Sequence, residues 1–217
     1  MSRRPLQLSL PCRGRGGFRP GAGRPRGTRV SHHGRESIAR PAPLHVVWRT
    51  RKDVRNLRGK ALFRQIKESL RRCHLKRGFQ ITHFSVLGNH VHALVEADQA
   101  ALLSRGMQGL GVSMAKRINR TSARRGAVFE DRFFSRELRT PSEVANAIDY
   151  VLRNHERHLA RQGAEAIHPV DPCSSAAVHH GPPLVAPPRT WLLRIGWRRT
   201  RHRDSARAPA DQRTTNA

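Results

Sequence analysis

Residues 87–97 read LGNHVHALVEA and place two histidines on either side of a single valine. Side chains at i and i+2 of a β-strand point to the same face, so His90 and His92 should stand side by side while Val91 points the other way. Gly88-Asn89 is a two-residue hairpin signal, so the preceding run FQITHFSVL (79–87) should pair with the histidine strand. The histidine pair fits either a metal site or a solvated polar face of a sheet.

The elements on either side of this hairpin predict an α+β domain. LHVVWRT (44–50) and VFEDRFFSREL (128–138) are typical of strands. Helices are expected over 59–77 and from about 98 to 120, the second with Asp98 as its N-cap. The order β-α-β-β-α-β, followed by a last helix, is a split βαβ unit of the ferredoxin-like kind. It builds an antiparallel sheet with helices packed on one face and leaves the other face free for a ligand.

The last helix has the clearest boundary signals in the chain. Thr140-Pro141-Ser142-Glu143 combines a capping threonine, a proline at the first helical position and a glutamate three residues after the cap. At 100° per residue the apolar positions of the helix, which runs to about Arg161, gather on one arc (Val144, Ile148, Val151, Leu152 and Leu159). Tyr150, the only tyrosine in the protein, lies nearly opposite that arc, and Asn154 shares its side one turn later.

Composition divides the chain into three parts and indicates a polyanionic partner. The 217 residues include 42 Lys+Arg and 15 Asp+Glu, a net charge of +27, and arginine forks suit phosphate oxygens. Residues 1–43 carry +9 and little apolar periodicity, which predicts a disordered basic arm. Residues 44–168 should form the folded domain. Residues 169–217 should form a Pro/Arg-rich C-terminal tail with a short tryptophan-containing segment.

Several classes of protein are disfavoured by the same composition. No apolar run approaches the ~20 residues that a membrane-spanning helix needs, and the apolar stretch near the N-terminus is too short for a signal peptide. The three cysteines are isolated, make no metal-binding pair and fit a reducing, cytoplasmic setting.

Two basic segments outside the predicted domain each have two interpretations. PGAGRPRGTR (20–29) resembles an AT-hook whose arginines, Arg24 and Arg26, would reach into the minor groove of DNA. The alternative is a basic arm that attracts any nucleic acid. RTWLLRIGWRRTRHR (189–203) mixes tryptophans with arginines, and would either stack on DNA or dock on the folded domain.

The histidines, the tyrosine and the asparagine together suit one kind of chemistry. Two neutral imidazoles and a carboxamide oxygen can hold a divalent cation with positions left open for phosphate oxygens. Tyrosine is a suitable nucleophile where a broken phosphodiester must be remade, because the phosphotyrosine conserves the energy of the bond.

The two motifs GNHVHALVEA and VANAIDYVLRNHERH (144–158) resemble those of the single-tyrosine HUH transposases. The nearest branch is the one associated with repetitive extragenic palindromes in bacteria, and the resemblance covers about residues 44–165. It implies that His90, His92 and Asn154 bind Mg²⁺ or Mn²⁺. It also implies that Tyr150 attacks single-stranded DNA beside a hairpin and forms a 5′-phosphotyrosine. One departure is His155, which follows Asn154 where this branch often has proline.

The resemblance also implies the partners and setting of the protein. Its substrate would be single-stranded DNA with hairpins formed by palindromic repeats, and Arg132 and Arg136 are the basic residues expected beside the scissile strand. A monomer is favoured over a homodimer, and the expected location is the bacterial cytoplasm, at the nucleoid.

Two alternative functions remain at this point. The first is a catalytically retired or non-enzymatic nucleic-acid-binding protein, whose binding would be salt-sensitive and would give no covalent adduct. The second is a related nuclease that starts plasmid or phage replication. Such proteins commonly carry a helicase, and this chain has no GxxxxGK[ST] phosphate-binding loop.

Overall fold

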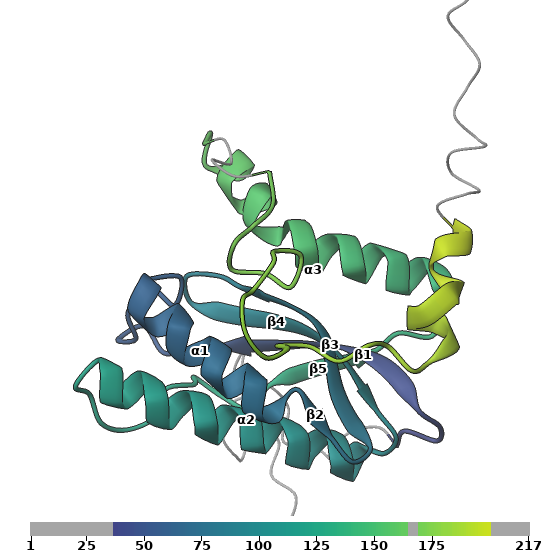
Figure 1. The fold of residues 1–217 in the computed structure, drawn as a ribbon, viewed down its shortest axis with the longest axis horizontal. Coiled ribbons are helices and arrows are strands. Elements are labelled where there is room, and N and C mark those ends of the chain that lie inside the picture. Colours follow the sequence, from purple (N-terminus) through teal and green to yellow (C-terminus); the bar gives the residue numbers. More distant parts are fainter. Residues whose placement is uncertain (1–36, 165–168, 201–217) are drawn as a thin grey trace, which may run out of the picture.

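The structure is a computed structural model that describes residues 37–164 and 169–200. One antiparallel sheet of five strands has the order β2-β3-β4-β1-β5 (Figure 1). The elements in chain order are β1 (Ala42–Arg49), α1 (Lys60–Cys73), β2 (Leu75–Lys76), β3 (Phe79–Val86), β4 (His90–Ala97), α2 (Ala100–Thr121), β5 (Phe134–Glu137), α3 (Pro141–Arg161) and the short π-helical turn η1 (Leu192–Gly196). The predicted α+β class and its split βαβ unit are confirmed, because β3, β4, β1 and β5 lie in the order of that unit.

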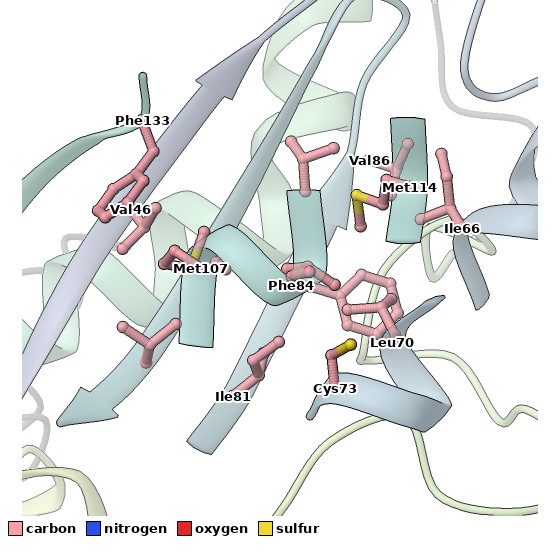
Figure 2. Close-up of a cluster of buried hydrophobic side chains, with 14 of the residues drawn as sticks. Val46, Ile66, Leu70, Cys73, Ile81, Phe84, Val86, Met107, Met114 and Phe133 are labelled. Atoms are coloured by element: carbon pink, nitrogen blue, oxygen red, sulfur yellow. The ribbon is translucent and has the colours of Figure 1, made fainter. Parts of the chain in front are cut away.

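The two helices of the unit pack on one face of the sheet, as predicted (Figure 1). Alternation along β4 sends Val91, Ala93 and Val95 into this core. Figure 2 shows the middle of the cluster, with Phe84 among side chains from both helices. Its larger members include Ile66, Leu70, Ile81, Phe84, Met107 and Met114.

Two glycines allow α2 to approach the sheet closely. A Cβ at Gly106 would lie 2.4 Å from the ring of Phe79, and a Cβ at Gly111 would lie 1.9 Å from the ring of Trp48. Both aromatic rings belong to the buried cluster or pack against it. Any side chain at these glycines would therefore push the helix away from the core.

The last helix, α3, lies on the opposite face of the sheet (Figure 1). Its capping box is formed as predicted: the Thr140 hydroxyl accepts from the Glu143 N–H at 3.2 Å, and the Glu143 carboxylate accepts from the Thr140 N–H. A second apolar cluster joins α3 to this face of the sheet and to η1; its buried members are Leu94, Leu138, Val144, Ala147, Ile148, Val151 and Leu193. α3 and η1 therefore cover part of the face that the sequence predicted to be free for a ligand.

The segment from 169 to 187 runs along the outer edge of β3. The N–H of Val86 donates to the carbonyl of Cys173 at 2.9 Å, and the N–H of Ala186 donates to the carbonyl of Ile81 at 2.8 Å. Arg58 makes a bidentate ion pair with Asp171, with N–O distances of 2.7 and 3.0 Å. Residues 169–200 thus complete the fold, since their backbone satisfies polar groups that an edge strand would otherwise leave unpaired.

A buried carboxylate fastens the end of this segment to the sheet. Glu96 on β4 is fully buried and accepts hydrogen bonds from the Gln80 amide, the backbone N–H of Arg189, and both the N–H and the hydroxyl of Thr190, at 2.6–2.7 Å. Beyond this clasp, Trp197 packs against the α3 cluster while Trp191 stays exposed. Docking of the tryptophan segment on the domain, one of its two interpretations, is therefore observed.

Three local predictions differ from the structure. The N-cap of α2 is Gln99 and not Asp98, whose carboxylate instead pairs with Arg189 at 2.9 Å. The strand expected over 128–138 is regular only at 134–137, because Phe129 and Phe133 turn inward onto the ring of Trp48. The helix expected over 59–77 ends at Cys73, where the chain turns into β2 and reverses at Gly78, which has a φ of 69°.

Arg24 and Arg26 lie outside the described residues. The division of the chain at 43/44 and 168/169 remains a prediction. Within 37–164 and 169–200, the structure contains no helix long and apolar enough to cross a membrane.

Candidate active site

The two histidines of β4 lie on the α3 side of the sheet. The hairpin closes through the N–H of Leu87, which donates to the carbonyl of His90 at 2.9 Å, so Gly88-Asn89 forms the turn. From there the strand alternates, and the rings of His90 and His92 lie 4.8 Å apart between centroids. His92 is 3% exposed, and His90, nearer the turn, is half-buried and contacts the ring of His158 on α3 at 5.9 Å.

Helix α3 brings Tyr150 to these histidines. The Tyr150 ring lies edge-on to the ring of His92 at 5.3 Å. Tyr150 remains 36% exposed and lines a cavity of about 430 Å³ together with Arg136 and Arg157. The guanidinium of Arg157 lies 5.9 Å from the centre of the Tyr150 ring and pairs with Asp149. The tyrosine is thus held against a histidine on one side and opens to solvent on the other.

A third histidine, which the sequence did not single out, completes the cluster. His45 on β1 lies with its Nε2 3.1 Å from Nδ1 of His92, and its ring is 5.8 Å from that of Tyr150. The antiparallel register sets Val47 opposite His92 and His45 opposite Leu94. The alternation of LHVVWRT could have placed His45 and Val47 on one face, but only the pairing of β1 with β4 brings His45 to the site.

Burial keeps these imidazoles neutral. It lowers the pKa of His92 to about 3, with further lowering by the neighbouring His90 and His45. It lowers the pKa of His90 to about 4, with contributions from His158 and Arg49. It also lowers the pKa of His45 to about 4, with a contribution from Arg136. Each ring therefore carries one unprotonated nitrogen near neutral pH, and this is the form that binds metal ions.

Asn154 lies deeper than its place on the helix predicted. The sequence placed it opposite the apolar arc with Tyr150, but it is only 2% exposed. α3 lies against the sheet with a face broad enough to bury Ala147 and Asn154 as well as the apolar arc. Among the described residues, neither Nδ2 of Asn154 nor Nε2 of His92 has a hydrogen-bond partner, although both atoms are buried.

The comparison that decides the family concerns the same part of the chain. A family model described as "Transposase IS200 like" matches residues 41–154, which is more than half of the protein and includes His90, His92, Tyr150 and Asn154. The chain belongs to the IS200-like transposase family. The resemblance seen in the two motifs is thereby confirmed at the level of the family, and a role in DNA transposition follows from it.

Two solved structures resemble this transposase in part. A REP-associated tyrosine transposase bound to a REP hairpin is 16% identical with a TM-score of 0.48, and the match covers 59% of this chain and 74% of that one. A putative transposase from Deinococcus radiodurans R1 is 14% identical with a TM-score of 0.39, over 58% of this chain and 93% of that one. A search of curated proteins gives no significant match.

The buried, unpartnered atoms of the transposase are compatible with a bound cation. A buried polar atom without a partner costs about 1–3 kcal/mol, and a cation or a water bound to Nε2 of His92 and to the Asn154 amide would offset that cost. A half-turn of the Asn154 amide would present its oxygen in place of Nδ2. In the described ranges, no group of three or more His, Cys, Asp and Glu side chains is placed to hold a metal ion, but the predicted set uses an asparagine as its third member.

The two arginines predicted to lie near the scissile strand have different surroundings. Arg136 on β5 is exposed, lines the Tyr150 cavity and donates to the Glu143 carboxylate at 2.6 Å. Arg132 lies in the irregular segment before β5 and is half-buried, with its backbone N–H bonded to the Asp131 carboxylate. The structure of the transposase thus places Arg136 at the cavity and Arg132 in the chain that leads to it.

Proposed function

We propose that the protein cuts and rejoins single-stranded DNA beside a hairpin, with Tyr150 as the nucleophile. The observation that carries the proposal is the convergence of Tyr150 on His92, at 5.3 Å between rings, from a helix and a strand that are far apart in the sequence. In an IS200-like transposase this pairing supplies a nucleophile beside two neutral imidazoles. His90, His92 and Asn154 are the residues that would hold Mg²⁺ or Mn²⁺.

The cleavage step follows from the chemistry of these groups. The phenolic oxygen of Tyr150 forms a bond to the scissile phosphorus as the bond to the 3′ oxygen breaks, leaving a 5′-phosphotyrosine and a free 3′-hydroxyl. Rejoining reverses the step, since a DNA 3′-hydroxyl attacks the phosphotyrosine and releases the tyrosine. A bound divalent cation would neutralise and orient the phosphate. No water is consumed, so the phosphotyrosine bond conserves the energy that is needed to reseal the strand.

The charges around Tyr150 favour this use. The guanidinium of Arg157 lies over the Tyr150 ring, where it can contact a phosphate that reaches the phenol. Arg136 lines the same cavity and can contact a phosphate of the bound strand. The net charge of +27 attracts single-stranded and hairpin DNA alike, in keeping with a monomer that resides on the bacterial nucleoid.

The proposed function is tested by looking for the covalent adduct. The purified full-length protein is mixed with a library of labelled single-stranded oligonucleotides that carry hairpins, with Mg²⁺, Mn²⁺ or a chelator, and separated on a denaturing gel. We expect a shifted band that requires metal and is destroyed by protease, and the retained oligonucleotides would identify the hairpin. DNA binding without an adduct under every metal would instead support a retired, DNA-binding protein.

His45 should act as a positioning residue for His92. If His92 donates from Nδ1 to Nε2 of His45, its own Nε2 is free of a proton and can bind a metal; the opposite arrangement would bury an N–H at Nε2 without an acceptor. We expect His45→Ala to weaken Mn²⁺ binding to the DNA-free protein by about 10- to 100-fold. Calorimetric titration with Mn²⁺ measures this change.

The control for His45 is a histidine of the same sheet face outside the cluster. His83 on β3 lies opposite Leu94 and is half-buried, so His83→Ala should lose packing but keep Mn²⁺ affinity. His45→Gln, which retains an acceptor, should recover part of the loss. Equal Mn²⁺ affinity in wild type and His45→Ala would show that His45 has only a packing role.

A further inference from the structure

An exposed phenylalanine lies on the active-site face of the sheet, at its edge. β5 is the last strand of the sheet, and its register sets Phe134 opposite Val47, which is itself opposite His92 on the next strand. The three residues thus form one row across neighbouring strands and point to the same face. With strands about 4.8 Å apart, Phe134 lies about 10 Å from His92.

The exposure of Phe134 sets it apart from its neighbours. Phe129 and Phe133 pack against the ring of Trp48, whereas Phe134 is 51% exposed. A large apolar side chain in this position does not serve the core. An exposed aromatic ring beside cationic side chains is the arrangement on which bases of single-stranded nucleic acids stack.

Phe134 also lines one of two cavities that share two lining residues, Arg136 and Glu143. It lines a cavity of about 460 Å³ together with Arg136, Arg139 and Glu143. The cavity beside Tyr150 is lined by Arg136 and Glu143 as well. Arg136 therefore lies at the wall of both the Tyr150 cavity and the cavity that Phe134 lines.

We propose that Phe134 is a stacking platform for a nucleobase of single-stranded DNA, one or two nucleotides from the phosphate that Tyr150 attacks. The site rests on the proposed function, and it adds a base-binding position to the nucleophile and the metal ligands. Every base has a π-face, so an exposed aromatic ring beside arginines binds single strands with little dependence on sequence. The strand would lie across the edge of β5, with a phosphate near Arg136.

The charge of the protein favours DNA over a second protein chain at this edge. An exposed edge strand can also pair with another copy of the same sheet. However, each copy carries a net charge of +27, and like charges oppose association. The same positive charge attracts DNA, which is a polyanion.

The test compares full-length variants at Phe134 for binding to a DNA hairpin with a single-stranded flank and to the same hairpin without the flank, in a chelator so that no cutting occurs. We expect Phe134→Ala to weaken binding of the flanked hairpin by about 10-fold and to leave binding of the bare hairpin unchanged. Phe134→Leu should behave like the alanine variant, whereas Phe134→Tyr should behave like the wild type. A 5-iodouracil placed in turn at each flank position should photo-crosslink to Phe134 at one or two positions.

Three outcomes would overturn the stacking platform. The first is that the wild type and Phe134→Ala bind each of the two DNAs with the same affinity. The second is that Phe134→Leu binds the flanked hairpin with wild-type affinity. The third is a dimer, seen in sedimentation, that Phe134→Ala dissociates. Because these measurements use no cleavage, they are independent of the adduct gel. A flank-dependent loss without any adduct would leave Phe134 as a base-stacking site of a DNA-binding protein that does not cut DNA. An adduct with no loss would support cleavage and refute the stacking platform.

Discussion

Tyr150→Phe should abolish the covalent protein–DNA adduct and leave DNA binding nearly unchanged. The substitution removes one oxygen atom, the proposed nucleophile, while the ring keeps its edge contacts with His45 and His92. Loss of a nucleophile lowers the rate of the chemical step by several orders of magnitude. The denaturing gel measures the adduct, and fluorescence anisotropy with the same hairpin DNA in a chelator measures binding.

The chain contains a single tyrosine, so the site of the adduct can be identified directly. Tyr150 is the only tyrosine among the 217 residues, so a phosphotyrosine found by mass spectrometry in the adduct identifies its position without peptide mapping. The matched control is Asn146→Ala, which alters the same cavity wall and keeps the phenol. An adduct that persists in Tyr150→Phe at the wild-type rate would show that another side chain attacks the DNA.

Replacing either histidine of β4 with alanine should remove metal-dependent cleavage. Each substitution would remove one imidazole ligand from the proposed metal site. Loss of a group that only supports a ligand already costs about 10- to 100-fold in metal affinity or activity. We therefore expect cleavage to fall by about a hundredfold or more at a fixed Mn²⁺ concentration. Binding of hairpin DNA in a chelator should persist, because the net charge of the protein is unchanged.

The two alanine variants need different controls for misfolding. His92 is 3% exposed and bonded to His45, so His92→Ala also leaves a cavity, and its thermal unfolding must be compared with that of the wild type. His90 is half-buried beside the turn, and His90→Ala should keep a wild-type unfolding temperature. His83→Gln serves as the matched variant for a half-buried strand histidine. If His90→Ala cut hairpin DNA as fast as the wild type, the metal site would have to be sought elsewhere.

The sequence was most informative where local signals fix the geometry. A strand alternates whatever its neighbours do, so the shared face of His90 and His92 followed from their spacing. The beginning of α3 followed from Thr140, Pro141 and Glu143, because a capping box involves only adjacent residues. These two elements carry the nucleophile and the predicted histidine ligands.

Features that depend on distant pairing could not be predicted in the same way. His45 reaches His92 only through the register of β1 and β4, and the two histidines are 47 residues apart in the sequence. Asn154 looked solvent-facing because the helix was considered alone, and the sheet beneath it makes the buried face broader. The run GPPLVAPPR (181–189) has no periodicity, yet the segment around it is held to β3 by backbone hydrogen bonds, which do not depend on the identity of the side chains.

The hydrogen bonds that hold Arg189 and Thr190 to Glu96 limit how far the protein can be shortened from its C-terminus. Among the described residues, three of the four groups that donate to this carboxylate belong to Arg189 and Thr190. A chain cut before Arg189 would leave the Glu96 carboxylate with one of these donors, and each lost hydrogen bond to a carboxylate costs about 1.5–3 kcal/mol. The same strand carries His90 and His92. A truncated protein that failed to cut DNA would therefore report a damaged β4, and its inactivity would say nothing about whether the C-terminal segment touches the substrate.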